Sequence, residues 1–207
     1  MKERSIEQTL RAFSEDLASE RPVPGGGSAA AYAGALGAAL AAMIGRIRAK
    51  KDADVAPRYV EDADELRAAL LRLVDDDASA FGEFADAMKL PRATDREKQE
   101  RRERMQAALV GAARVPLETA HASRRVLDAC ERGMAIATDS TVSDLGVAAV
   151  LAYAALEGAA LNVRINLASI KDPEAAASLT AQLERALEGA ARQRDSILES
   201  VNARIAP

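Results

Sequence analysis

The 207-residue sequence contains one cysteine, one histidine and no tryptophan. A lone Cys130 excludes an internal disulfide framework and a cysteine zinc cluster. A lone His121 excludes a metal site built from several histidines, so we expect no metal centre. Three tyrosines and three phenylalanines are too few for the aromatic platforms on which single-stranded nucleic acid stacks. Basic residues are not in excess either, since 28 Lys and Arg stand against 32 Asp and Glu; this balance argues against a nucleic-acid or anionic-membrane partner.

The sequence also lacks a pattern typical of a targeting or membrane-spanning segment. The first 22 residues mix both charge signs without a long apolar core, which is not typical of a secretory signal. The longest uncharged apolar run, from Ala29 to Gly45, consists mostly of alanine and glycine and is just short of a spanning helix. We therefore expect a buried helix in a cytoplasmic protein.

Alanine is the most abundant residue, with 48 of the 207 positions, nearly a quarter of the chain. Alanine is the best helix former, and the β-branched and aromatic residues that favour strands are scarce. The sequence therefore predicts an all-α protein, an antiparallel bundle of about five to seven long helices in one domain over residues 1–207. Apolar periodicity and breakers predict helices over 4–19, 29–50, 58–89, 94–132, 143–170 and 174–203.

Several residues set the expected helix ends. Ser28 and Ser143 are the expected N-caps of the second and fifth helices. Thr94 with Glu97 fits a capping box, and Pro116 should kink or split the fourth helix. The helices at 29–45 and 145–161 are apolar over more than one stripe, and two such helices suggest an oligomer interface.

Asp77 breaks the apolar pattern of the third helix. An ionised carboxylate on a buried stripe needs an ion pair or hydrogen bonds. One reading is an ion pair with a helix arginine; the other is a carboxylate facing a cleft, with a raised pKa suited to proton transfer. The stripe comprises Leu66, Leu70, Leu73, Asp77, Phe81, Phe84 and Met88.

Polar residues also interrupt the fifth helix. Asn162 and Asn166 lie four residues apart on one face, and either interhelical hydrogen bonds or ligand contacts would satisfy their amides. Asp144 lies at the start of the same helix, where the helix dipole favours a carboxylate. His121 is expected at the surface and Cys130 in the core, without a catalytic role.

The segment Pro24–Ser28, which contains three consecutive glycines, opens the second predicted helix. Glycine permits close backbone approach, and helix N-terminal amides bind anions. The segment matches no nucleotide-binding loop, because neither GxxxxGK[ST] nor GxGxxG is present. A tight turn that lets helices pack is the structural alternative.

Taken together, these segments resemble the cyclodeaminase domain of the formiminotransferase-cyclodeaminase family. The matches occur in the family's order and span about residues 10–172. They are SEDLAS at 14–19, PVPGGGSAAA at 22–31, AGALGAAL at 33–40, DASAF at 77–81, KLP at 89–91, VPL at 115–117, SDLGVAA at 143–149 and NVRINL at 162–167. Many relatives carry an asparagine in the loop that here reads Ala137 to Thr141, and a difference there could alter the substrate or the activity.

The resemblance implies an all-helical homodimer, here a stand-alone protein without a transferase domain. It implies cyclisation of 5-formiminotetrahydrofolate to 5,10-methenyltetrahydrofolate with release of ammonia, without metal or redox cofactor. On this interpretation Asp77 transfers protons, and Asp144 is a second carboxylate that acts as an acid/base partner or binds the pterin. The expected substrate-binding residues are Gly25, Gly26, Gly27, Ser28, Asn162 and Asn166.

Two alternatives stay open at this point. Some stand-alone relatives act as methenyltetrahydrofolate cyclohydrolases, in which water attacks the same methenyl cation. A non-catalytic helical dimer that binds folate or a partner protein belongs to a different functional class.

Overall fold

The structure, a computed structural model, describes residues 5–52 and 56–206, and within these ranges the only regular elements are helices. The predicted all-α class is confirmed. One 3-10 turn, η1, precedes seven α-helices. Their bounds are η1 Ser5–Glu7, α1 Leu10–Leu17, α2 Gly26–Ala49, α3 Pro57–Met88, α4 Asp95–Gly133, α5 Val142–Leu167, α6 Pro173–Leu187 and α7 Ala190–Ile205.

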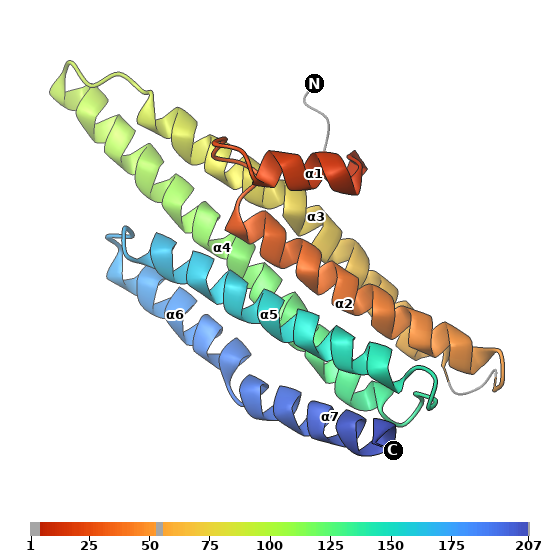
Figure 1. Ribbon diagram of the computed structural model, residues 1–207. Helices are drawn as coiled ribbons and strands as arrows, with labels where there is room; N and C mark the ends of the chain where they lie inside the picture. The colour runs from red at the N-terminus through yellow and green to blue at the C-terminus, as the bar shows by residue number, and fades with distance from the viewer. Residues whose placement is uncertain (1–4, 53–55, 207) are drawn as a thin grey trace.

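Helices α2 to α5 form the body of an antiparallel bundle (Figure 1). Each of the four runs opposite to its predecessor, and α2 packs against α3, α4 and α5. The short helix α1 crosses near the beginning of α2, whereas α6 and α7 follow one another along the outside of α4 and α5. A continuous core of alanine, leucine and valine side chains joins these helices.

Small residues bring the α2 backbone close to α5. A Cβ atom added to Gly37 would lie 2.9 Å from the backbone oxygen of Ala148, a distance that real Cβ contacts avoid. Ala38 and Ala149 are fully buried nearby in the core. The small apolar residues of α2 and α5 are therefore explained in part by the close packing of the two helices. Both are long and apolar enough to cross a membrane by composition, with 61% and 50% of their most apolar windows buried inside the bundle.

The start of the chain differs from the predicted helix 4–19. A 3-10 turn at Ser5–Glu7 precedes α1, which begins after Thr9. The Thr9 hydroxyl accepts a hydrogen bond from the Ala12 backbone N–H at 3.1 Å, so Thr9 acts as an N-cap. Residue 4, the predicted first position, lies outside the described residues.

Two predicted serine caps are wrong. Helix α2 begins at Gly26 with Gly25 as N-cap, so Ser28 already lies in its first turn, where its hydroxyl contacts α3. Helix α5 begins at Val142 after Thr141, and Ser143 is its second residue. In both cases the helix begins before the serine. The preference of serine for N-cap positions therefore gave the wrong first residue.

The fourth helix is continuous, whereas the last one is divided. Helix α4 runs unbroken through Pro116, so of the two predicted effects the split is wrong and the kink stays a prediction. The capping box of Thr94 with Glu97 is confirmed. The predicted helix 174–203 is two helices, because Gly189 adopts a left-handed conformation with φ of 69°. Glycine carries no Cβ to oppose that conformation, so the chain turns there between α6 and α7.

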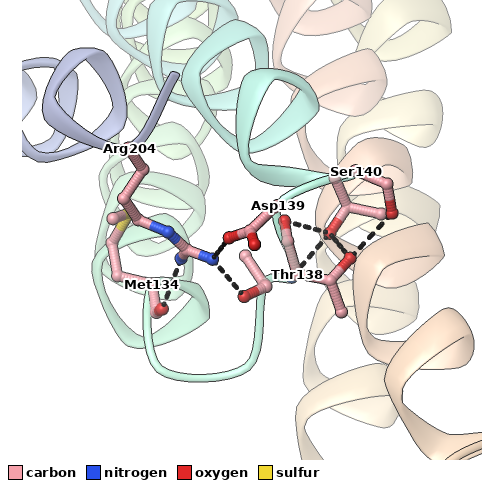
Figure 2. A network of polar contacts seen from close by, with 7 residues as sticks. Met134, Thr138, Asp139, Ser140 and Arg204 are labelled. Atoms are coloured by element: carbon pink, nitrogen blue, oxygen red, sulfur yellow. Dashed lines mark hydrogen bonds and ion pairs between the residues drawn. The ribbon is translucent and has the colours of Figure 1, made fainter. Parts of the chain in front are cut away.

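The α4–α5 connection is held by the last helix (Figure 2). The guanidinium of Arg204 donates to the Asp139 carboxylate at 2.9 Å and to the Ala137 carbonyl at 3.0 Å. Within the loop, the Thr138 backbone N–H donates to the Thr141 hydroxyl oxygen at 2.9 Å. These contacts fix the chain where it enters α5.

Candidate active site

Asp77 of α3 faces the beginning of α2. Its Oδ2 atom accepts the Ser28 backbone N–H at 2.8 Å and lies 2.9 Å from the Ser28 hydroxyl. Gly25 has no side chain with which to cap α2, and the first N–H groups of a helix lack intrahelical acceptors. Asp77 therefore supplies, from another helix, the acceptor that the N-terminus of α2 needs. Asp77 is thus hydrogen-bonded to Ser28 and, across the residues that the structure describes, not paired with a helix arginine as the alternative interpretation predicted.

Gly27 makes this contact sterically possible. A Cβ atom added to Gly27 would lie 2.6 Å from the carboxyl carbon of Asp77, so any side chain would displace the carboxylate. Gly26 faces Asn162, where an added Cβ would lie 3.5 Å from the amide nitrogen. The glycine segment thus permits close approach between helices at the position where Asp77 lies.

The environment of Asp77 raises its pKa above the ordinary value of 3.8. Burial is the largest cause, because a desolvated carboxylate is less stable than one in water. The hydrogen bonds from the Ser28 hydroxyl and backbone N–H oppose this effect by stabilising the ionised form. Burial prevails, which moves the carboxyl toward the range useful for proton transfer.

Asp77 lines a cavity of about 320 Å³. Among the described residues that line it, Asp77 is the only titratable one. The lining residues come from the segment before α2, from its first turn, and from α3, α4 and α5. The lining comprises Pro22, Val23, Gly25, Gly26, Gly27, Asp77, Ala80, Phe81, Phe84, Leu109, Ala112, Asn162, Ile165 and Asn166.

Asn162 and Asn166 belong to the same cavity, and backbone contacts anchor both side chains. The Asn162 Nδ2 donates to the Gly158 carbonyl at 2.9 Å. The Asn166 Nδ2 donates to the carbonyls of Ala112 and Asn162 at 2.9 and 3.0 Å. The predicted interhelical hydrogen bond is confirmed for Asn166, which reaches α4, whereas Asn162 bonds within its own helix. Both residues line the cavity, and ligand contact by their amides stays a prediction.

Asp144 lies elsewhere. It occupies the first turn of α5, 18 residues before Asn162, or ~27 Å along the helix axis at 1.5 Å per residue. Asp144 is not among the residues that line the cavity. The structure therefore brings Asp77 together with the glycine segment and both asparagines, but not with the second predicted carboxylate.

The remaining reactive side chains lie apart from the cavity, as expected. His121 is exposed on α4, and its Nε2 lies 3.4 Å from the Gln182 carbonyl. Cys130 is fully buried, and this burial raises the pKa of its thiol to about 12. A thiol that stays protonated is a poor nucleophile.

The apolar walls were not recognised from the sequence as part of a site. The sequence pattern places Phe81 and Phe84 on the apolar stripe of α3, which predicts a core position rather than a site. In the structure Phe81 is 40% exposed and lines the cavity together with Phe84 and Leu109. The available signal was the stripe itself, which continues past Asp77 toward the end of α3.

A comparison with known families identifies the chain. Residues 9–185 match the family described as Formiminotransferase-cyclodeaminase. The chain belongs to this family. The match covers the glycine segment, Asp77 and both asparagines, which are the residues that the fold brings to one cavity.

Individual members support this assignment. The methenyltetrahydrofolate cyclohydrolase of Methylorubrum extorquens is 36% identical over 204 residues, which cover 96% of this chain and 98% of the relative. The formimidoyltransferase-cyclodeaminase of Rattus norvegicus is 33% identical over 204 residues, but this chain covers only 38% of that longer protein. The crystal structure of the formiminotetrahydrofolate cyclodeaminase of Thermotoga maritima superimposes with a TM-score of 0.79 at 28% identity, covering 96% of each chain.

Proposed function

We propose that this cyclodeaminase-family protein converts 5-formiminotetrahydrofolate to 5,10-methenyltetrahydrofolate and ammonia. The observation that carries the proposal is the desolvated Asp77 carboxyl in a cavity with two amide side chains and apolar walls. Relatives named for reactions of formimino- and methenyltetrahydrofolate support the choice of substrate.

The reaction requires one proton to move between two nitrogens of the substrate. N10 attacks the carbon of the protonated formimino group, and a bond forms between N10 and that carbon. Asp77 accepts the N10 proton and returns it to the amino nitrogen, which then leaves as ammonia when its bond to carbon breaks. The positive charge of the formimino group is conserved in the methenyl product. A single carboxyl group can therefore perform both transfers, in keeping with a cavity whose lining, over the part of the chain that the structure describes, contains one titratable residue.

The Ser28 hydroxyl is placed to support both protonation states of Asp77. It lies 2.9 Å from Asp77 Oδ2 and 3.0 Å from the Val74 carbonyl oxygen. One hydroxyl hydrogen can serve only one acceptor at a time. When Asp77 is ionised, the hydroxyl donates to the carboxylate; when Asp77 is protonated, it donates to Val74.

Binding and electrostatics complete the proposed role of the cavity. The attacking nitrogen and the formimino carbon belong to the same molecule, so holding them in register contributes to the rate. The ionised Asp77 stabilises the amidinium and methenyl cations in a site of low polarity. The rings of Phe81 and Phe84 offer flat apolar surfaces for the planar parts of the folate. This chemistry uses groups of the substrate and of the protein, so we propose that no metal or redox cofactor takes part.

A second candidate is hydrolysis of methenyltetrahydrofolate to the 10-formyl compound. This candidate is favoured because the match to the Methylorubrum extorquens cyclohydrolase covers 96% of this chain and 98% of that protein. In this reaction Asp77 accepts a proton from water as the oxygen bonds to the methenyl carbon, and it returns the proton to N5 as the bond between N5 and that carbon breaks. The second water proton is released to solvent as the formyl C=O forms, which removes the positive charge of the methenyl cation. The same cavity serves both reactions because both pass through a carbon bonded to N5 and N10.

A groove of about 540 Å³ next to the cavity suits the anionic end of the substrate. Phe84 and Leu109 line both the cavity and the groove, so the two are adjacent. The groove also contains Arg101, Arg102 and Lys171, for which no ion pair with a carboxylate is recorded within the described ranges. We propose that the glutamyl carboxylates of the folate bind here.

One acidic residue also lines the groove and limits its positive charge. Glu103 accepts a hydrogen bond from the Gln99 side chain at 2.6 Å. Among the described residues that line the groove, three cationic side chains stand against this one carboxylate, and the resulting net positive charge favours an anionic ligand.

An exposed apolar stripe on α5 supports a homodimer. Val147 and Val150 are about half exposed, and Leu161 and Ile165 are 64% and 69% exposed. These residues recur at helical spacing on one side of α5, so they form a continuous stripe. We propose that a second copy of the chain covers it, and that the protein is a cytoplasmic dimer without a membrane span.

The test offers both folates to the purified protein. With 5-formiminotetrahydrofolate, methenyl absorbance and ammonia should appear together, which would establish the cyclodeaminase. If neither appears, loss of methenyl absorbance from added methenyltetrahydrofolate, above the buffer rate, would establish the cyclohydrolase. Folate binding without either reaction would support the non-catalytic alternative.

A further inference from the structure

Pro116 leaves a carbonyl of α4 without its normal helical partner. In an α-helix the N–H of each residue bonds to the carbonyl four residues earlier, and proline has no N–H. The Ala112 carbonyl therefore cannot receive the bond that residue 116 would ordinarily donate. Helix α4 nevertheless continues through this position without interruption.

The side chain of Asn166 fills that gap. Its Nδ2 donates to the Ala112 carbonyl at 2.9 Å and also to the Asn162 carbonyl at 3.0 Å. An amide nitrogen carries two hydrogens, and both are used by these bonds. Both partners are carbonyl oxygens, so the reverse orientation of the amide would place oxygen against oxygen. The contacts thus fix which way the amide points.

Only the Oδ1 atom of Asn166 remains to face a ligand in the cavity that Asn166 and Ala112 both line. We propose that Pro116 is a positioning residue, which fixes Asn166 as a hydrogen-bond acceptor and so selects ligands that present an N–H donor there. This inference rests on the proposed function, because the reduced pterin ring of a tetrahydrofolate offers such donors at N3, N8 and its 2-amino group.

The first test is Pro116→Ala. The alanine restores an N–H at residue 116, so the Ala112 carbonyl is shared between two donors. The bond from Asn166 is then weaker, and the amide is freer to rotate. We expect KM for the folate substrate to rise about tenfold, with a smaller change in kcat. The thermal midpoint should not fall, because alanine is a better helix former than proline. A KM equal to that of the wild type would overturn the proposal, and so would a KM increase that accompanies loss of helical signal.

A double-mutant cycle separates positioning from general disturbance. Asn166→Ala alone should raise KM, and adding Pro116→Ala to it should have no further effect, because the residue being positioned is gone. Additive effects would overturn the proposal. Pro57→Ala is the control, since Pro57 is the first residue of α3, where a missing N–H costs no helical bond.

A spectroscopic readout does not depend on turnover. The side-chain amide signals of Asn166, assigned by their loss in Asn166→Ala, should exchange slowly with solvent in the wild type and at least tenfold faster in Pro116→Ala. Equal exchange rates would overturn the role of Pro116. Turnover by the wild type is measured first and reports on the proposed function by itself, so the two failures are distinguishable.

Discussion

Asp77 accepts a hydrogen bond from the Ser28 backbone N–H at 2.8 Å, which joins residues 49 positions apart in the sequence. The contact caps α2 and holds a carboxyl group at the wall of the cavity. Asp77 therefore combines a structural role in capping α2 with the proposed role in proton transfer. The positive end of the α2 dipole points at this carboxylate and helps to offset the cost of its burial.

Replacing Asp77 by asparagine tests its chemical role. The amide cannot accept and return a proton, so turnover should fall by at least ~100-fold, the lower end for acid–base catalysis. Helical signal in circular dichroism should be retained. Asp76→Asn is the matched control, because Asp76 is the exposed neighbour on the same helix. Turnover close to wild type in Asp77→Asn would remove Asp77 from the mechanism.

The raised pKa of Asp77 predicts the acidic limb of the pH profile. Asp77 must be ionised to accept a proton, so kcat/KM should fall as the pH drops through a pKa above the ordinary value of 3.8. The measurement is kcat/KM against pH in buffers of constant ionic strength. An acidic limb at or below the ordinary value would contradict the assigned environment.

The same shift predicts how stability depends on pH. The folded state holds the Asp77 proton more tightly than the unfolded state, so this group's contribution is most favourable below its ordinary pKa and is lost as the pH rises through the raised pKa. Asp77→Asn removes this dependence. The thermal midpoint of the variant, minus that of the wild type, should therefore increase as the pH rises across this window. A difference that decreases with pH would contradict the sign of the shift.

Gly27→Ala tests the close approach between α2 and Asp77. The added methyl group would lie 2.6 Å from the carboxyl carbon, so the carboxylate must move and turnover should fall at least ~10-fold, since small misplacements of catalytic groups are costly. Gly111→Ala is the control, because nothing lies within 4 Å of its added Cβ. In α4 that change should stabilise the protein by ~0.5–1 kcal/mol. Equal turnover in both variants would separate Gly27 from the site.

The basic groove predicts a selective effect on binding. Arg102→Ala and Lys171→Ala should each raise KM for the glutamate-bearing substrate roughly three- to tenfold, since each removes one charge contact. The inhibition constant of 6-methyltetrahydropterin, which has no glutamyl tail, should not change. Arg192→Ala is the control, because Arg192 is exposed on α7 and outside the groove. Equal effects on both ligands would argue against a tail site.

The stripe on α5 predicts the assembly. Leu161→Glu places a charge in the proposed interface, so sedimentation should show a shift from dimer to monomer, with an increase of at least ~100-fold in the dissociation constant. Leu10→Glu is the control, since Leu10 is also highly exposed but lies on α1. A Leu161→Glu protein that remains dimeric at the same concentrations would exclude this surface.

Much of the fold could be predicted because helix formation depends on local properties. Alanine content and apolar periodicity identified the helical class, and the bounds of α3 and α4 differ by one residue from those predicted. The periodic stripe also singled out Asp77, since its position relative to leucines and phenylalanines is a property of one helix. Local signals placed the start of α2 too late, because Asp77 of another helix caps its first turn. They also missed the break at Gly189, where the glycine adopts a left-handed conformation.

The sequence by itself determined which residues share a helix face and which side chain breaks the apolar pattern. Only the tertiary structure decided which of them meet. It paired Asp77 with Ser28, joined Asn166 to the carbonyl freed by Pro116, and left Asp144 at the opposite end of α5. The physical reason is that helical periodicity relates residues within a few turns, whereas contacts between helices depend on how closely their backbones pack.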